Sequence, residues 1–192
     1  TFSRFVTEAD MPNLGTKDCS QVFASGKMGM FFWSTSILAR MTEWVGDKFE
    51  LKTDIFPNVK KGVGRLPAGG NGAVMLTRDP GKQEAAWKFI KFATSGKGAS
   101  IVARTTGYMP PNKKANEKYL KDFYKKHPNN YVAVTELPLM TNWYAFPGRN
   151  GLKITDVIYD HMQSIVTGKR AGEPLKVLDD MVRDVQKLLP GK

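Results

Sequence analysis

Residues 23–36 read Phe-Ala-Ser-Gly-Lys-Met-Gly-Met-Phe-Phe-Trp-Ser-Thr-Ser, and this stretch decides how the chain is organised. A glycine at position 26 suits the left-handed end of a short helix. The apolar run 28–33 has the length of a buried strand. Ser34 or Thr35 then offers a hydroxyl that can accept a hydrogen bond in the first turn of another helix. The order helix, strand, helix predicts an α/β chain.

The rest of the sequence continues this alternation and then becomes helical. Two further strands are expected at 49–56 and 73–77. The loop between them, 57–72, holds two prolines and five glycines. Helices are expected over 83–95, 99–106 and most of the chain after residue 108. The prediction is therefore a helix-rich α/β fold.

The composition is that of a folded chain. It has 192 residues, of which 41% are hydrophobic, and this is enough to bury one ordinary core. No apolar run approaches the roughly 20 residues that a membrane helix needs. No signal peptide is visible at residue 1, and the first residues resemble the middle of a domain. A processed or truncated piece of an exported protein would look like this.

The net charge of +11 arises from 29 Lys and Arg against 18 Asp and Glu. Such a charge fits either a surface for nucleic acid or anionic membrane, or a basic protein with solvated faces. The cations are scattered in pairs such as Lys113-Lys114 and Lys125-Lys126, with no run of five or more. No zinc-finger, RNA-recognition or basic-zipper spacing is present. General basicity is the favoured interpretation, and no nucleic-acid partner is expected.

No set of residues is arranged for catalysis or for metal binding. Cys19 is the single cysteine, so no internal disulfide can form, and its place in a short helix favours a structural role. Cys and His do not cluster at metal-binding spacing, so neither a metal nor a cofactor is expected. His161 lies on an apolar helical stripe and is interpreted as a core residue. Without a carboxylate pair or a nucleophile with its base, an enzyme is not supported.

Five segments, in their order along the chain, carry a resemblance to a known family. They are residues 23–30, 33–36, 66–71, 84–92 and 106–110, which read FASGKMGM, WSTS, LPAGGN, EAAWKFIKF and TGYMP. Together they resemble the carboxyl-terminal half of the extracellular, or periplasmic, solute-binding proteins that serve ABC importers. Within family 1 of these proteins, the subgroup that binds sugars and glycerol-3-phosphate is the most similar.

The resemblance implies a periplasmic-binding-protein-like (type II) fold, in which two α/β lobes hold a solute in the cleft between them. This chain would be an incomplete, carboxyl-terminal portion of it, rich in helices. Residues 1–30 and 95–192 would belong to the carboxyl-terminal lobe, and residues 31–94 to the amino-terminal lobe. The implied partners are a small sugar or polyol phosphate, the transmembrane subunits of an ABC permease, and the missing amino-terminal half of the same protein. The implied location is periplasmic or extracellular.

Four candidate ligand contacts lie at the ends of expected elements. Ser34 can offer its hydroxyl and nearby backbone N–H groups to a sugar hydroxyl or a phosphate, although it can equally be a plain helix cap. Gly69 and Gly70 let the backbone approach a ligand, or else form a flexible turn. Tyr108 stands where glycerol-3-phosphate binders of the family place a contact tyrosine. Its ring and hydroxyl suit a ligand, and packing in the core is the alternative.

A second group of candidates lies in one aromatic loop. Trp143 and Tyr144 can stack on a sugar ring, and Arg149 can hold a phosphate through two parallel hydrogen bonds. The alternative is that the loop simply packs onto its lobe. In the glycerol-3-phosphate subgroup the arginine that holds the phosphate would fall near Thr155, so phosphate recognition would require Arg149 or Lys153 to substitute for it.

Capture of a solute by lobe closure, with delivery to a permease, is the function that the sequence favours. A basic nucleic-acid-binding or helical adaptor domain is the alternative from another class. An enzyme on the same fold is the third. A DNA-binding assay at increasing salt separates the first two, because phosphate contacts give a steep salt dependence.

Overall fold

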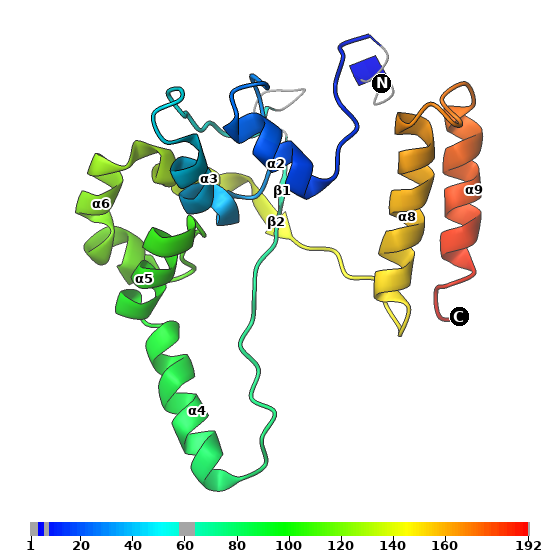
Figure 1. Cartoon of the computed structure of the whole chain (residues 1–192). Helices are drawn as coiled ribbons and strands as arrows, with labels where there is room; N and C mark the ends of the chain where they lie inside the picture. Colours follow the sequence, from blue (N-terminus) through cyan, green and yellow to red (C-terminus); the bar gives the residue numbers. More distant parts are fainter. Residues whose placement is uncertain (1–3, 6–7, 58–63, 192) are drawn as a thin grey trace. The chain divides into compact units, whose positions relative to one another are not determined.

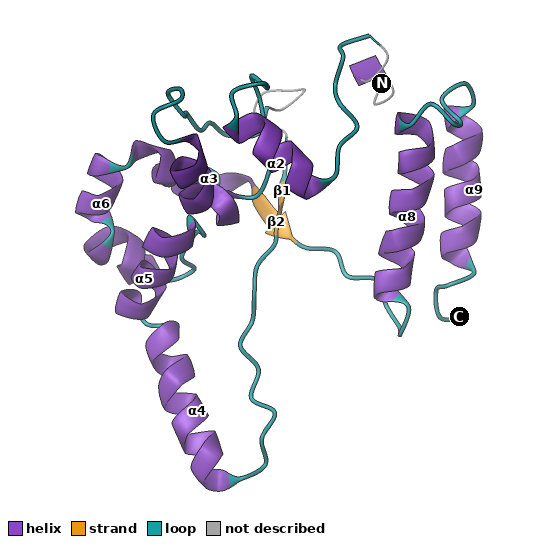
Figure 2. Cartoon of the chain, in the orientation of Figure 1, coloured by secondary structure: helices purple, strands orange, loops and turns teal. Residues whose placement is uncertain are grey.

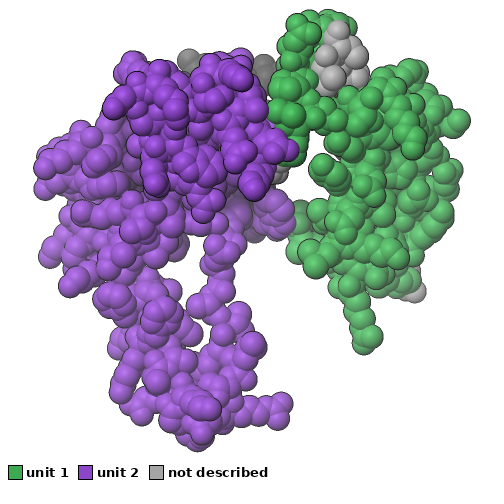
Figure 3. Space-filling model, viewed as in Figure 1, with its two compact units in different colours: residues 1–15, 144–192 green, residues 16–143 purple. Residues whose placement is uncertain are grey.

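The structure of the chain is a computed structural model, and it describes residues 4–5, 8–57 and 64–191. Two units can be distinguished, coloured separately in Figure 3, and each is described by itself. Unit 1 is made of residues 1–15 and 144–192, and unit 2 is made of residues 16–143. These units are groups of residues in mutual contact. The assignment of 1–30, 31–94 and 95–192 to two lobes stays a prediction.

Unit 2 begins with the elements that the opening stretch predicts. Helix α2 (Thr16–Ala24) is followed by the short 3-10 helix η1 (Thr35–Ile37) and by α3 (Leu38–Val45). Ser34 caps η1, because its side chain accepts a hydrogen bond from the Ser36 N–H. Helices α2 and α3 pack together, and one core lies between them: Phe23, Ala24, Met41 and Val45.

The strands expected at 28–33, 49–56 and 73–77 are wrong for the residues that the structure describes. Two strands form elsewhere: β1 (Leu66–Ala68) pairs in parallel with β2 (Met140–Asn142), as Figure 2 shows. β1 lies within the segment expected to be a loop, of which 58–63 fall outside the described residues. Alternating apolar residues indicate an extended backbone, but a strand also needs a neighbouring strand for its hydrogen bonds. The alternation cannot show whether that neighbour is present.

Helices α4 (Pro80–Ala93) and α5 (Gly96–Thr106) form the middle of unit 2. Asp79 caps α4 by accepting from the Lys82 N–H at 2.8 Å, and Ser95 caps α5 by accepting from the Gly98 N–H at 3.1 Å. Gly107 ends α5 in the left-handed region, at φ +97°, as the sequence predicts. The expected helices after residue 82 are thus confirmed, with shifts of a few residues at their ends.

Short helical segments complete unit 2. They are the π-helical turn η2 (Ala115–Tyr119), α6 (Lys121–Lys126), η3 (Pro128–Tyr131), α7 (Val132–Thr135) and η4 (Leu137–Leu139). Their shared core with α5 contains Leu120, which is fully buried, and Tyr124. The Tyr124 hydroxyl donates to Asn116 Oδ1 at 2.8 Å. Burial, with a smaller contribution from Tyr131, raises the pKa of Tyr124 to about 12.

Unit 1 contains a hairpin of two helices, α8 (Gly151–Val166) and α9 (Pro174–Gln186), which lie side by side in Figure 1. Pro174 occupies the first turn of α9, where its missing N–H leaves no bond unmade, as the sequence predicts. Ile154 and Val177 are fully buried. Within the described residues, no helix is both long and apolar enough to cross a membrane.

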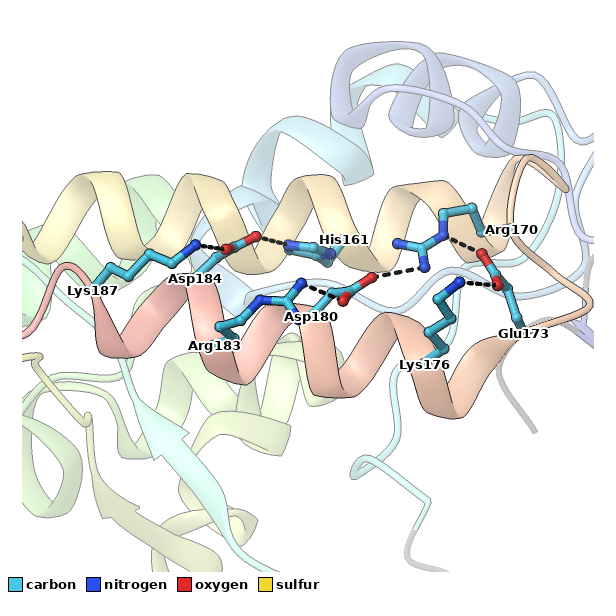
Figure 4. Close-up of polar contacts among 8 residues, drawn as sticks. All are labelled: His161, Arg170, Glu173, Lys176, Asp180, Arg183, Asp184 and Lys187. Carbon is cyan, nitrogen blue, oxygen red and sulfur yellow. Dashed lines mark hydrogen bonds and ion pairs between the residues drawn. The ribbon is translucent and has the colours of Figure 1, made fainter.

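A chain of charged side chains runs along the α8–α9 hairpin (Figure 4). The Arg170 guanidinium donates to Glu173 at 2.6 Å and to Asp180 at 2.8 Å. Further along, Asp184 lies 3.2 Å from the ring of His161. His161 is therefore largely buried, as the sequence predicts, but it has a polar partner on the neighbouring helix. Hydrogen bonds from Arg170 and then Arg183 hold the pKa of Asp180 below its usual range.

Candidate functional site

The parallel pair of strands in unit 2 brings two of the predicted residues together. Gly69 follows β1 and Trp143 follows β2, at the same edge of the pair. A side chain at position 69 would begin 3.9 Å from the six-membered part of the Trp143 ring. The glycine therefore leaves the ring next to bare backbone, and 64% of Trp143 is exposed. In open α/β sheets, ligands bind outside the carboxyl ends of the strands, and an exposed aromatic face suits that place.

Tyr108 joins the same corner through Asn71. The Asn71 side-chain amide donates to the Tyr108 hydroxyl at 3.1 Å, and the Tyr108 N–H donates to Thr106 Oγ1 at 3.0 Å. The ring is half-buried, so it lies at the surface and outside the core. Residues 69–71 thus contact both Tyr108 and Trp143. We call Gly69, Gly70, Asn71, Tyr108 and Trp143 the strand-end corner.

Ser34 lies on a segment that contacts the turn before Tyr108. A side chain at Gly107 would begin 2.5 Å from the Thr35 carbonyl oxygen, so the end of α5 and the start of η1 are in close backbone contact. The structure confirms the capping role of Ser34. Its hydroxyl is exposed, and contact with a ligand stays a prediction.

A hollow of about 160 Å³ opens beside Ser34, and we call it the Ser34 hollow. Its apolar wall includes the half-exposed ring of Trp33. Its polar wall includes the hydroxyl of Thr53 and the carboxyl groups of Asp54 and Glu136. An aromatic face with hydrogen-bonding oxygens beside it can hold a molecule that carries several hydroxyl groups.

The polar wall of the Ser34 hollow is held by contacts between distant segments. Asn129 on η3 accepts from the Thr53 N–H at 3.1 Å through Oδ1 and donates to the Leu51 carbonyl at 2.7 Å. Glu136 is half-buried, and this burial raises the pKa of its carboxyl group. A backbone hydrogen bond from Phe56 partly offsets that effect on the pKa. Glu136 is therefore easier to protonate than an exposed glutamate.

Sequence reasoning missed Trp33, Asn71, Asp54 and Glu136 as site residues. Trp33 and Asn71 stand inside the quoted segments 33–36 and 66–71, next to Ser34 and Gly70, so the segments themselves were a signal. Asp54 and Glu136 carry no local signal, because only the long-range contacts of Thr53 and Phe56 place them in the hollow.

Comparison with known proteins decides the family. The sequence profile described as bacterial extracellular solute-binding protein matches residues 4–132, about two thirds of the chain. The chain belongs to this family.

Relatives of this solute-binding protein include proteins of Brucella abortus and Brucella suis that carry the provisional name of binding protein. Each is 26% identical over 96% of this chain. The aligned part is 43% of the relative's own length, so the chain spans less than half of the curated relatives that it matches. The predicted family is confirmed, whereas the sugar and glycerol-3-phosphate subgroup and the carboxyl-terminal position stay predictions.

Two predicted contact residues of the solute-binding protein lie in unit 1. Tyr144 is exposed, and its ring meets Phe146 edge to face with centroids 5.2 Å apart. Arg149 is exposed, and within the described residues it forms no ion pair. Thr155 lies in α8, where its hydroxyl donates to the Gly151 carbonyl at 3.1 Å. The structure thus brings Gly69, Tyr108 and Trp143 together, and the roles of Tyr144 and Arg149 stay predictions.

The described ranges 4–5, 8–57 and 64–191 contain no group of three His, Cys, Asp or Glu side chains that could hold a metal ion. The chemistry available in unit 2 is that of hydrogen bonding and ring contact. It suits reversible binding of a small polar molecule.

Proposed function

We propose that the protein captures a sugar-like, polyhydroxylated solute as the binding component of an ABC transporter and delivers it to the transmembrane permease. In this proposal the complete protein has the type II two-lobed fold and works in the periplasm or outside the cell. It acts by binding and release, not by catalysis. Family membership supports the general role, and the strand-end corner and the Ser34 hollow support the choice of solute.

The observation that carries the proposal is the combination of exposed aromatic faces with nearby neutral and acidic oxygens in unit 2. Trp143 and Trp33 present half-exposed or more exposed rings, which can cover the apolar face of a sugar. The Tyr108 hydroxyl, Asp54 and Glu136 offer hydrogen-bond acceptors for its hydroxyl groups.

A neutral sugar is favoured over glycerol-3-phosphate by the charges of the Ser34 hollow. Asp54 and Glu136 both line it, and like charges placed against a phosphate would oppose binding. Lys52 is on the same lining, but it is paired with Glu50 at 3.2 Å. A polyol phosphate held by Arg149 is the second candidate, because that guanidinium forms no ion pair within the described residues.

The proposal is tested by titration calorimetry of the full-length protein against monosaccharides, disaccharides, polyols and glycerol-3-phosphate. We expect binding of a neutral sugar, weakened at least tenfold by Trp143→Ala or Glu136→Gln. Tyr159→Ala is the matched control, since Tyr159 is an equally exposed aromatic residue on α8 of unit 1. Tight binding of glycerol-3-phosphate, lost in Arg149→Ala and unchanged in Glu136→Gln, would favour the second candidate instead.

A further inference from the structure

An arm of unit 2 exposes more apolar surface than a soluble element can leave uncovered. The arm consists of residues 70–93, that is, an extended segment up to residue 79 followed by helix α4. Figure 1 shows it reaching away from α2, α3 and α6. Leu76 is 87% exposed, Phe89 68% and Trp87 57%, and no residue of α4 is buried.

The apolar residues of α4 form a continuous stripe. Ala86, Phe89, Ile90 and Ala93 recur at the spacing of one helical face, so they point to the same side. Phe89 is exposed and the other three are only half-buried. A helix with such a stripe is stable when the stripe packs on a sheet or another helix. The described residues provide no such layer over it.

The extended segment of the arm lacks backbone partners as well. Among the described residues, no backbone–backbone hydrogen bond involves positions 70–78. Val74 and Leu76 lie two residues apart and are both exposed, as on one face of a strand. An extended segment with open N–H and C=O groups has the properties of a sheet edge that awaits a neighbouring strand.

The arm belongs to the shared family domain. The family match covers residues 4–132 and therefore includes the whole arm. The Brucella relatives are more than twice as long as the region that aligns with this chain, since that region is 43% of their length. Polypeptide of sufficient length to form the missing layer is thus part of such proteins.

We propose that residues 73–77 form a β-strand, with α4 packed on the same sheet, and that the neighbouring strands come from the part of the same polypeptide outside these 192 residues. The partner strand would supply hydrogen bonds to the segment 73–77. Its sheet would cover the α4 stripe and the exposed side chains of Val74 and Leu76. The occupant of the arm's surface is therefore the protein's own chain, neither a second copy nor a lipid surface.

Hydrogen–deuterium exchange on the full-length protein tests this inference. At a concentration where light scattering shows a monomer, we expect the amides of 74–77 to exchange at least 100-fold more slowly than unstructured peptide. Exchange at the unstructured rate would overturn the proposal. Slow exchange that appears only as the concentration rises would assign the surface to a second copy. Slow exchange that appears only with phosphatidylglycerol vesicles would assign it to lipid.

A pair of alanine variants of the full-length protein gives an independent readout. Phe89→Ala should lower the melting temperature by several degrees, because the ring would be buried against the missing layer. Lys91→Ala changes an exposed side chain two positions away on the same helix and should leave the melting temperature within one degree. Equal melting temperatures for the two variants would show that Phe89 stays exposed in the complete protein. Both results are independent of which solute binds.

Discussion

Replacing Gly107 by alanine should be among the most damaging small substitutions in this chain. Gly107 has φ +97°, where a side chain is strained, and the left-handed conformation costs roughly 1–2 kcal/mol for a non-glycine residue. The new methyl group would also begin 2.5 Å from the Thr35 carbonyl oxygen and 2.7 Å from Leu38 Cβ. Inserting a methyl group into such a close contact costs about 1–3 kcal/mol. The expected loss of stability is therefore about 2–5 kcal/mol.

Two other glycines separate these contributions. Gly168 has φ +82° but nothing within 4 Å of a new methyl group, so Gly168→Ala should show only the conformational cost, roughly 1–2 kcal/mol. Gly70 has neither problem, and Gly70→Ala should stay within about 0.5 kcal/mol of the parent. Urea unfolding of the full-length protein, followed by circular dichroism, measures all three. A loss for Gly107→Ala no larger than that for Gly168→Ala would refute the close contact with η1.

The Gly107 substitution should also weaken solute binding in protein that remains folded. The methyl group would push the turn before Tyr108 away from Thr35, and both segments contribute to the proposed site. Calorimetry well below the unfolding temperature should show reduced affinity for Gly107→Ala and normal affinity for Gly168→Ala. Normal affinity in both variants would separate the α5–η1 contact from the binding site.

Three further predictions concern the site, the hairpin and the core. Tyr108→Ala should weaken solute binding in the full-length protein by about 1–3 kcal/mol, measured by calorimetry, because it removes a ring face and the partner of Asn71; a sharp drop in melting temperature with intact affinity would make Tyr108 a core residue. The α8–α9 hairpin should lose stability as the pH falls below about 4, measured by hydrogen exchange of its amides. The pKa values of Asp180 and Asp184 are lowered in the folded state, so their stabilising contribution is present above the ordinary carboxyl pKa and is lost as the pH falls through the lowered values; a hairpin equally protected at pH 2 and 6 would contradict this. Leu120→Ala should cost about 2–5 kcal/mol in urea unfolding, since its side chain is fully buried, and a loss below about 1 kcal/mol would show that Leu120 is exposed in solution.

Features set by a few neighbouring residues could be predicted from the sequence. Ser34 as a cap, Gly107 as a helix end and Pro174 as a helix start each depend on one side chain and the adjacent turn, and all three are confirmed. The strand expected at 73–77 depends on a partner elsewhere in the chain, which local alternation cannot reveal. Within the described residues that partner is absent, so the segment is extended and unpaired.

The candidate site divides in the same way. Gly69, Tyr108 and Trp143 could be proposed because they stand in segments that resemble the family, and the structure places them around one corner. Asp54 and Glu136 could not, because their approach depends on contacts with residues far along the chain.

The parallel pairing of β1 with β2 has a consequence for how the protein folds. It joins residues 66–68 to residues 140–142, and Thr53 meets Asn129 across 76 positions of sequence. Contacts this far apart form only after a large loop has closed, and proteins rich in them fold slowly. Helices such as α5 and α9, which close on local contacts, can form first. We therefore expect the ability to bind solute to return last during refolding, after most of the helical signal has been recovered.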